Sequence, residues 1–271
     1  MLLADPQTDS WRPGMVRSFI KAKGSRSTRA STVFGQTERG PLVVESVLLD
    51  FAETLVTAVP CWEQPQIVAC WECGRMVTAE EVKEAIWHVW EPLEGCAHPA
   101  ASVSEEAYTA WIGEIERRIL ARLGVPADHL DRAATRVMQL QADPSGYCLY
   151  PDVLPALTWL RQCGIRTAIV SNFAWCLPEL TDALGLGGLI DAVVTSARAG
   201  YRKPRPEIFH QALAGLGASA ERAIFIGDDP LCDIGGARDA GMAAILLDRR
   251  RRSGPGRIAS LRALPGLICR G

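Results

Sequence analysis

The sequence predicts an α/β protein with a doubly wound parallel sheet and a small helical domain inserted into it. Residues 43–49 form an apolar, β-branched run, which is typical of a strand buried on both faces. After residue 146, short apolar runs alternate with segments of helical periodicity, as strands joined by crossover helices do. Between these two regions, residues from about 60 to 145 are helical in character.

Each element follows from its local pattern. Apolar side chains recur at helical spacing in residues 80–90 and 107–123, and the tryptophans among them are typical of a buried helix face. Beyond residue 146 we predict strands at 166–170, 192–195, 223–226 and 243–247, and helices at 152–163, 176–184, 206–216 and 233–240. The chain thus divides into a core at 42–58 and 146–271, a helical domain at 59–145, and a basic tail at 1–41 that we predict to be disordered.

Charge and hydropathy argue against several classes of protein. A formal net charge of −2 over 271 residues predicts attraction neither to nucleic acid nor to a membrane surface. The first residues lack an apolar signal core, so we predict a cytoplasmic location. The nine cysteines are then expected to be reduced thiols. Cys70 and Cys73 form a single Cys-x-x-Cys pair, which is short of the four ligands of a structural zinc site.

Polar side chains follow three of the predicted strands. Asp50 and Thr54 come after the first strand, Ser171 and Asn172 after the second, and Asp228 after the strand at 223–226. Ligands of such sheets bind at the carboxyl ends of the strands. We therefore expect these side chains to gather at one edge of the sheet.

The chemistry of this group suits a phosphoryl substrate. Asp50 is the candidate nucleophile, because a carboxylate that attacks phosphorus divides a hard hydrolysis into formation and breakdown of an aspartyl-phosphate. Lys203 would neutralise a phosphoryl oxygen as a point charge. Thr54, Ser171 and Asn172 would donate hydrogen bonds to the same group.

Two anions must meet in such a reaction, so the sequence also predicts a divalent cation, Mg²⁺. Asp50, Asp228 and the backbone carbonyl of Ala52 would supply its protein ligands, because Mg²⁺ is bound through few carboxylates and several waters. Asp229 and Asp233 would bind the metal's waters or orient the lysine. The predicted partner is a small molecule, phosphorylated or acidic.

These motifs resemble those of the haloacid dehalogenase superfamily hydrolases over about residues 43–247. The matching stretches are 48–56, 169–173, 200–209 and 226–229 with 233–242. The resemblance implies a Rossmann-like core, the nucleophile Asp50 and a Mg²⁺ cofactor. The helical domain is similar to the C1 cap of subfamily IA, a lid that opens and closes over the site.

Ala52 departs from the pattern of the phosphatases in this family. They usually carry an aspartate there, which protonates the leaving oxygen and then activates water. Loss of such a group typically costs about 10²–10⁴-fold in rate. The neighbouring Glu53 need not point inward, because successive strand residues face opposite ways.

Three functions remain open at this point. A phosphohydrolase would tolerate Ala52 if the leaving group needs no proton, as in an acyl phosphate, or if Glu53 or a cap residue replaces the acid. A phosphonate or haloacid hydrolase is the second. The phosphonoacetaldehyde hydrolases resemble this chain in having alanine at that position, but they need a cap lysine that forms a Schiff base, and Lys83 lies among glutamates that suit a solvated helix face better. The 2-haloacid dehalogenases are metal-free and typically lack the Gly-Asp-Asp found here at 227–229. The third is a catalytically degenerate protein that binds a phosphorylated or acidic ligand or a protein partner.

Overall fold

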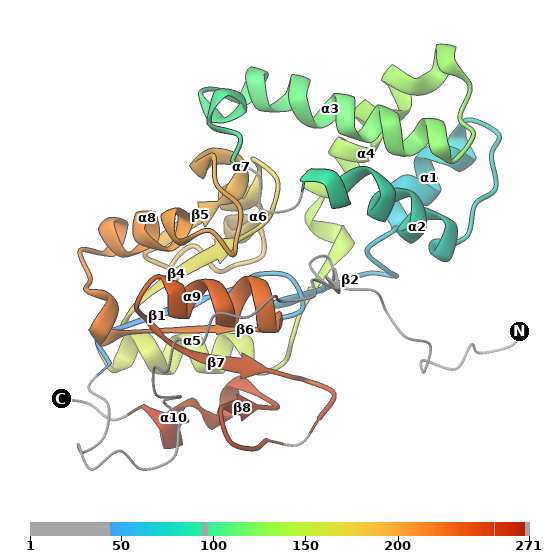
Figure 1. Ribbon diagram of the computed structural model, residues 1–271. Helices are drawn as coiled ribbons and strands as arrows, with labels where there is room; N and C mark the ends of the chain where they lie inside the picture. Colours follow the sequence, from blue (N-terminus) through green and yellow to red (C-terminus); the bar gives the residue numbers. More distant parts are fainter. Residues whose placement is uncertain (1–43, 94–96, 252, 269–271) are drawn as a thin grey trace, which may run out of the picture.

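The computed structural model describes residues 44–93, 97–251 and 253–268. At its centre lies a six-stranded sheet in the order β5-β4-β1-β6-β7-β8, and every neighbouring pair in it is parallel (Figure 1). This arrangement confirms the predicted α/β fold. The basic tail predicted at 1–41 lies outside the described residues. The strands are β1 (Ser46–Leu49), β4 (Arg166–Ser171), β5 (Ala192–Thr195), β6 (Ala223–Gly227), β7 (Ala243–Leu247) and β8 (Arg257–Ile258).

Strand β1 occupies the middle of the sheet because its side chains are small or apolar and are buried on both faces. Leu49 pairs in register with Ile169 of β4 and with Ile226 of β6. The carboxyl ends of these three neighbouring strands therefore lie at one edge. The residues that follow them are brought together there.

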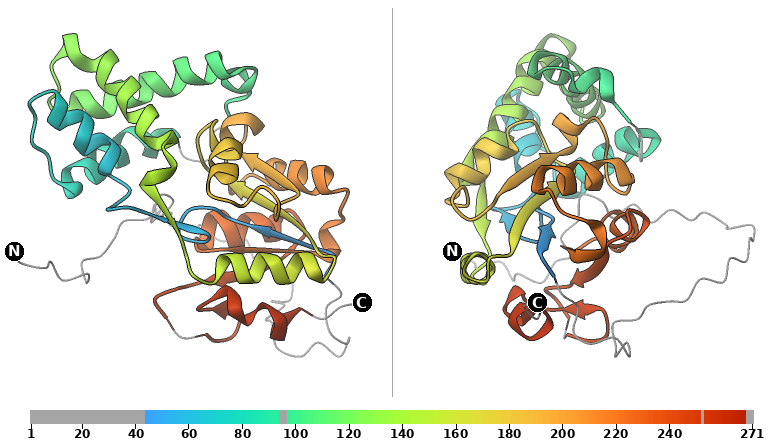
Figure 2. Two further views of the ribbon diagram at one scale, coloured as in Figure 1. Left: turned by 180° about the vertical axis from the view of Figure 1, so that it is seen from behind. Right: turned by 90° about the vertical axis from the view of Figure 1, so that its left-hand side faces the viewer.

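Alternate residues of each strand enter two different cores, which makes the sheet doubly wound. In β1, Leu49 packs into the core on one face and Leu48 into the core on the other. Figure 2 shows the covering helices on opposite sides of the sheet. The first face carries α5 (Val153–Gln162), α6 (Leu177–Ala183) and α10 (Leu264–Leu267), with the turn η7 (Leu261–Ala263); the second carries α8 (Pro206–Leu216) and α9 (Gly236–Asp239).

A separate group of four helices, here called the helical insert, lies beyond the carboxyl edge of the sheet (Figure 1). It has its own apolar core, in which Val82, Ile119 and Val137 are fully buried. Its helices are α1 (Gln64–Glu72), α2 (Ala79–Trp90), α3 (Glu105–Arg122) and α4 (Leu130–Ala142), with the turns η1 (Glu91–Leu93), η2 (Pro99–Ser102) and η3 (Ala127–His129). None of the described helices is long and apolar enough to cross a membrane.

Several short elements join these parts and carry too few residues to show a periodicity in the sequence. The antiparallel pair β2 (Val56–Ala58) and β3 (Tyr147–Leu149) connects the sheet to the insert. The helix predicted at 233–240 instead begins as a π-helical segment, η6 (Pro230–Gly235), because Asp229 caps an earlier start. The remaining short segments are η4 (Pro144–Gly146), α7 (Ser196–Ala199) and η5 (Ala220–Arg222).

Asp152 fastens the C-terminal segment to the core. One of its carboxylate oxygens accepts hydrogen bonds from Arg249 Nη1 at 3.0 Å, Ser260 Oγ at 2.6 Å and Leu261 N at 2.8 Å. The side chain is buried, so these three donors replace water.

Replacing Asp152 with alanine leaves these donors without their acceptor, and we expect a loss of about 2–4 kcal/mol in the free energy of unfolding. Urea unfolding measures it. The matched control is Arg222→Ala, which removes an ion pair with Glu45 whose side chains are 51% and 40% exposed. That control should lose less than about 1 kcal/mol. Equal losses in the two variants would show that Asp152 does not anchor this segment.

Candidate active site

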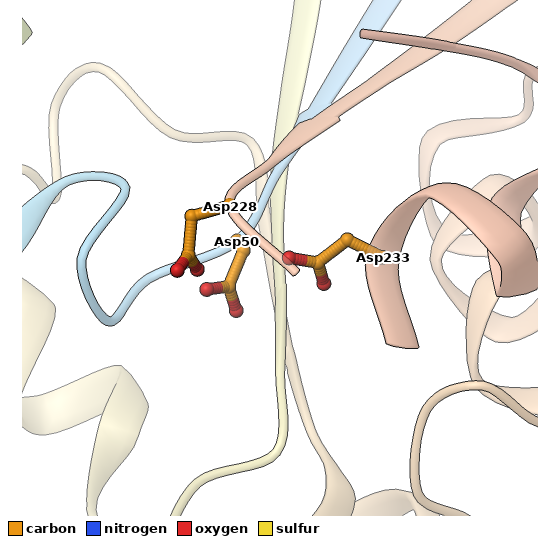
Figure 3. A group of neighbouring side chains, drawn as sticks. All are labelled: Asp50, Asp228 and Asp233. Carbon is orange, nitrogen blue, oxygen red and sulfur yellow. The ribbon is translucent and has the colours of Figure 1, made fainter. Parts of the chain in front are cut away.

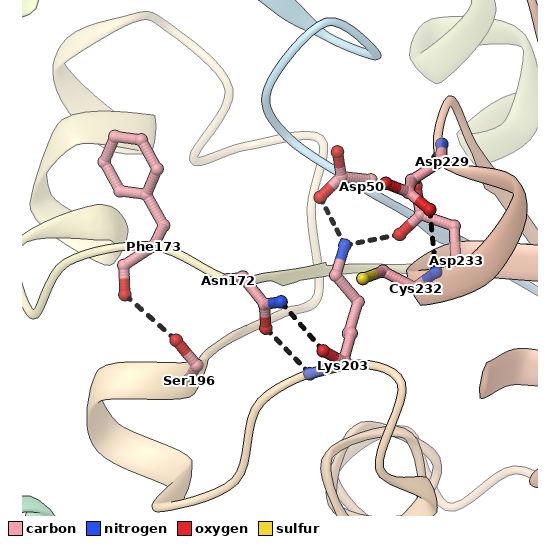
Figure 4. Close-up of polar contacts among 8 residues, drawn as sticks. All are labelled: Asp50, Asn172, Phe173, Ser196, Lys203, Asp229, Cys232 and Asp233. Carbon is pink, nitrogen blue, oxygen red and sulfur yellow. Dashed lines mark hydrogen bonds and ion pairs between the residues drawn. The ribbon is translucent and has the colours of Figure 1, made fainter. Parts of the chain in front are cut away.

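Asp50 lies directly after β1 at the carboxyl edge of the sheet and is 5% exposed. Its Oδ1 accepts a hydrogen bond from the Nζ of Lys203 at 2.6 Å. Asp233 Oδ1 accepts from the same ammonium, also at 2.6 Å (Figure 4). One buried cation therefore bridges two buried carboxylates.

Burial raises the pKa of Asp50 to about 6; the ammonium of Lys203 opposes this rise and the carboxylate of Asp233 adds to it. For Lys203, burial disfavours the charged form, but the two carboxylates outweigh it and raise the pKa above its ordinary value. The lysine thus stays protonated at neutral pH. One ammonium faces the two carboxylates of Asp50 and Asp233, so their negative charge is only partly neutralised.

Asp50, Asp228 and Asp233 together form an acidic group whose ligand atoms lie within 4.8 Å of one another. Figure 3 shows the three carboxylates converging from the ends of two strands and from η6. All three are buried, and hard carboxylate oxygens are the ligands that Mg²⁺ prefers. The residues present therefore fit a divalent cation. In the described part of the chain no other set of His, Cys, Asp or Glu side chains, including Cys70 and Cys73, is grouped in this way.

Asp229 and Asp233 shape the turn after β6. Asp229 Oδ1 accepts from the backbone N of Leu231 at 2.7 Å and of Cys232 at 2.8 Å, and so caps η6. Asp233 Oδ2 accepts from Asp229 N at 3.0 Å. A Cβ at Gly227 would lie 2.3 Å from that oxygen, so only glycine allows this approach. Asp233 is thereby aimed at the lysine.

Asn172 holds the loop that carries Lys203. Its Oδ1 accepts from Lys203 N at 2.7 Å and its Nδ2 donates to Lys203 O at 3.0 Å. The amide is engaged on both sides, which makes Asn172 a positioning residue in this arrangement. Ser171 is buried beside it and lines the cavity described next. Thr54 is fully buried and does not line that cavity, and its hydroxyl finds no hydrogen-bond partner among the described residues.

A cavity of about 480 Å³ lies between the sheet edge and the helical insert. The core contributes Asp50, Ala52, Ser171, Lys203 and Asp228 to its wall. The insert and its connections contribute mainly aromatic and aliphatic side chains, among them Trp62, Trp87, Trp90 and Ile112. Arg202 also lines it, with its guanidinium 4.6 Å from the ring centre of Trp90. Arg202 was not predicted from the sequence as a site residue, although it directly precedes Lys203, which was.

Ala52 faces the cavity with a methyl group that can transfer no proton. Glu53 does not replace it. Its backbone adopts a φ of 56°, and its carboxylate accepts from Thr57 Oγ1 at 3.1 Å, Trp62 Nε1 at 2.7 Å and Tyr150 Oη at 2.9 Å. Glu53 is not among the residues that line the cavity, so the geometry does not support its acting as the missing acid.

Lys83 likewise lies away from the cavity wall. Its ammonium pairs with Glu80 at 2.8 Å, and its side chain is 13% exposed. The imine chemistry that a phosphonate hydrolase of this type needs is therefore not positioned in this conformation.

Glu116 is a cavity residue that sequence reasoning missed. It is 3% exposed on α3, and its carboxylate accepts from Gln66 Nε2 at 3.1 Å and from Gln141 Nε2 at 3.4 Å. Burial raises its pKa to about 7. The available signal was a charged residue within the apolar stripe of the helix, between Ile112 and Ile119.

A group whose pKa is raised on folding stabilises the fold below its unfolded pKa, 4.5 here, and loses that contribution as the pH rises through about 7. The Glu116→Gln variant has no titrating carboxyl group at this position, so its stability does not fall with pH for this reason. We expect its stability relative to the wild type to increase by about 2–3 kcal/mol between pH 5 and pH 8. Urea unfolding of both proteins, without added metal, measures this difference.

The matched control is Glu114→Gln on the exposed side of the same helix, where a difference within about 1 kcal/mol is expected at both pH values. A Glu116→Gln difference that does not change with pH would mean that the carboxyl is not desolvated.

Comparison with known proteins agrees with this geometry. A family model described as haloacid dehalogenase-like hydrolase matches residues 44–241. Phosphoserine phosphatase of Thermus thermophilus is 31% identical over 175 residues, which make up 62% of this chain and 68% of that protein. Glyceraldehyde 3-phosphate phosphatase of Methanopyrus kandleri is 39% identical over 101 residues, 37% of this chain, and that match spans only 43% of the relative.

Among solved structures, the HAD-hydrolase YfnB of Bacillus subtilis, bound to magnesium, shares the fold. Its TM-score is 0.63 at 18% identity, with 83% of this chain and 99% of that chain covered. The family model includes β1 with Asp50, the loop of Lys203 and the acidic turn after β6. This chain therefore belongs to the haloacid dehalogenase-like hydrolases.

Proposed function

We propose that this protein is a Mg²⁺-dependent phosphohydrolase that acts on a small phosphorylated metabolite through an aspartyl-phosphate on Asp50. The observation that carries the proposal is the buried set of three carboxylates with one ammonium at the edge of the sheet, next to a cavity between the sheet and the helical insert. Two relatives named as phosphatases support it.

In this mechanism a carboxylate oxygen of Asp50 attacks the phosphorus, and the bond from phosphorus to the leaving oxygen breaks. Lys203 holds the other end of the carboxylate in place and offers its positive charge to a phosphoryl oxygen. Ser171 would donate to the phosphoryl group from the end of β4. Water then attacks the phosphorus of the aspartyl-phosphate, the bond to the Asp50 oxygen breaks, and the carboxylate is regenerated; phosphate leaves with the oxygen of the water, and a proton of that water passes to solvent.

Asp50, Asp228 and the backbone carbonyl of Ala52 would hold Mg²⁺, which when bound supplies the charge that lets two anions approach. Asp233 orients the ammonium of Lys203, as its 2.6 Å contact indicates. Asp229 keeps the turn in shape through its two backbone hydrogen bonds and would accept from a metal-bound water.

The helical insert would act as the cap over this site. Its aromatic wall would exclude water from the cavity when the cap closes over a substrate, which would strengthen the charge interactions inside. Because Ala52 supplies no acid, the preferred substrate would carry a leaving group that departs without a proton, such as an acyl phosphate. The second candidate, favoured by the same residue, is a binding protein that turns over little.

The first test is a screen of phosphorylated metabolites and acyl phosphates for phosphate release, and of 2-haloacids for halide release, with and without millimolar Mg²⁺. We expect release that depends on Mg²⁺ and is abolished by Asp50→Asn, which removes the nucleophile at constant size. Thermal unfolding provides a readout that needs no turnover: Mg²⁺ should raise the Tm of the wild type, and less so that of Asp50→Asn.

Phosphate release that persists in a clean preparation of the variant would refute the covalent mechanism. A rise in Tm caused by Mg²⁺ without phosphate release from any compound of the panel would favour the binding protein. Turnover of 2-haloacids without a Tm shift in Mg²⁺ would favour the metal-free dehalogenases.

A second prediction concerns the position of Ala52 itself. In Ala52→Asp a carboxyl group enters the cavity at the point where leaving oxygen and water are handled, and general acid–base catalysis contributes about 10²–10⁴-fold. We expect the kcat for simple alkyl phosphates to rise by at least about tenfold. Steady-state kinetics on both proteins, with Ala58→Asp at another position of the cavity wall as the control, measures this. An unchanged rate would mean that the missing acid does not limit the reaction.

A further inference from the structure

Three polar side chains that are linked by hydrogen bonds lie among the largely apolar residues that the helical insert presents to the cavity. They are Gln66 on α1, Glu116 on α3 and Gln141 on α4, and all three line the same cavity as Asp50. Their neighbours in that wall include Ile86, Trp87 and Ile112. Polar side chains from three separate helices thus meet within a largely apolar wall, and their burial there needs a physical explanation.

The carboxylate of Glu116 is the first anomaly. It is 3% exposed, and its hydrogen-bond donors among the described residues are two neutral amides, Gln66 at 3.1 Å and Gln141 at 3.4 Å. No described lysine or arginine forms an ion pair with it. A buried carboxylate without a cation is costly, and burial accordingly raises its pKa to about 7.

Gln66 is the second anomaly. Its amide nitrogen is used on Glu116, while its carbonyl oxygen is buried and has no hydrogen-bond partner in the described structure. Gln66 as a whole is 3% exposed. The cluster thus offers a carboxylate and a carbonyl, both acceptors, next to a cavity, and no described side chain donates to the second of them. A ligand with several donors and a positive charge matches this set.

Resting on the proposed function for the phosphoryl end, we propose that Gln66, Glu116 and Gln141 form a second subsite that binds a primary ammonium group of the substrate. An ammonium brings three N–H donors for the carboxylate and the Gln66 carbonyl, and its charge compensates Glu116. A hydroxyl brings one donor and no charge. The substrate class is therefore a phosphate compound with an amino group at its far end and an apolar body between, which suits the tryptophans of the wall.

The test uses aryl phosphates, because a phenolate leaves with little protonation and is compatible with Ala52. Four 4-(ω-aminoalkyl)phenyl phosphates, from aminomethyl to aminobutyl, cover the unknown span. Each is paired with the alkyl analogue that has CH₃ in place of NH₂ and with the corresponding alcohol. At pH 8 with Mg²⁺, the kcat/KM of the best amine should exceed that of its alkyl partner by about tenfold or more, as a charge-assisted hydrogen bond provides.

Glu116→Gln keeps the shape of the side chain and removes its charge, so the amine-to-alkyl ratio should fall towards one. Gln66→Met, which removes the orphan carbonyl, should lower the ratio as well. The control is Glu114→Gln on the exposed side of α3, which should leave the ratio unchanged. An equal ratio in the wild type and in both cavity variants would overturn the subsite, and a preference for the alcohol would replace the ammonium by a neutral donor.

Calorimetric binding of the same pairs to Asp50→Asn separates this proposal from the proposed function. A tighter Kd for the amine in Asp50→Asn, lost in Asp50→Asn combined with Glu116→Gln, supports the subsite even if the wild type hydrolyses none of the compounds. Turnover without any amine preference, in rate or in Kd, refutes the subsite and leaves the phosphohydrolase intact.

Discussion

The ammonium of Lys203 is the point on which the rest of the site depends. It is buried between Asp50, which follows β1, and Asp233 in η6, at 2.6 Å from an oxygen of each. Its own backbone is clamped by Asn172 after β4. One charge thus fixes the relative positions of three segments that are far apart in the chain. Removing it would leave two buried carboxylates without their shared cation, a kind of change that typically costs about 3–5 kcal/mol.

The parts of this centre that the sequence could predict are those set by strand ends. Asp50 and Asp228 follow short runs of buried apolar residues, and parallel strands in register bring such positions to one edge whatever the loops do. The direction of a side chain in a loop has no such local determinant. Thr54 was predicted to face the substrate, yet it is buried away from the cavity, and the amide of Asn172 was predicted as a donor, yet it binds backbone.

Residues whose environment is made by distant segments were the hardest to predict. Glu53 was considered as a substitute acid because it adjoins Ala52, but its carboxylate is held by Trp62 and by Tyr150, which lies 97 residues further along the chain. Glu116 lies in a helix that the sequence predicted, and its two amide partners come from helices 50 and 25 residues away. The carboxylate of Glu116 is desolvated because the helices of the insert pack around it, and the local sequence does not show that packing.

A leaving group that needs no proton compensates for the missing acid at Ala52 in only one of the two halves of the proposed reaction. A leaving group that departs as an anion needs no proton, so formation of the aspartyl-phosphate would tolerate the alanine. Breakdown of that intermediate needs a water to be activated, and this requirement is the same for every substrate. In such a site the second half of the reaction is the slower one, and phosphate would remain on Asp50 for most of the cycle. An insert that binds the far end of the substrate helps the first half alone, because that part of the substrate has already left when water attacks.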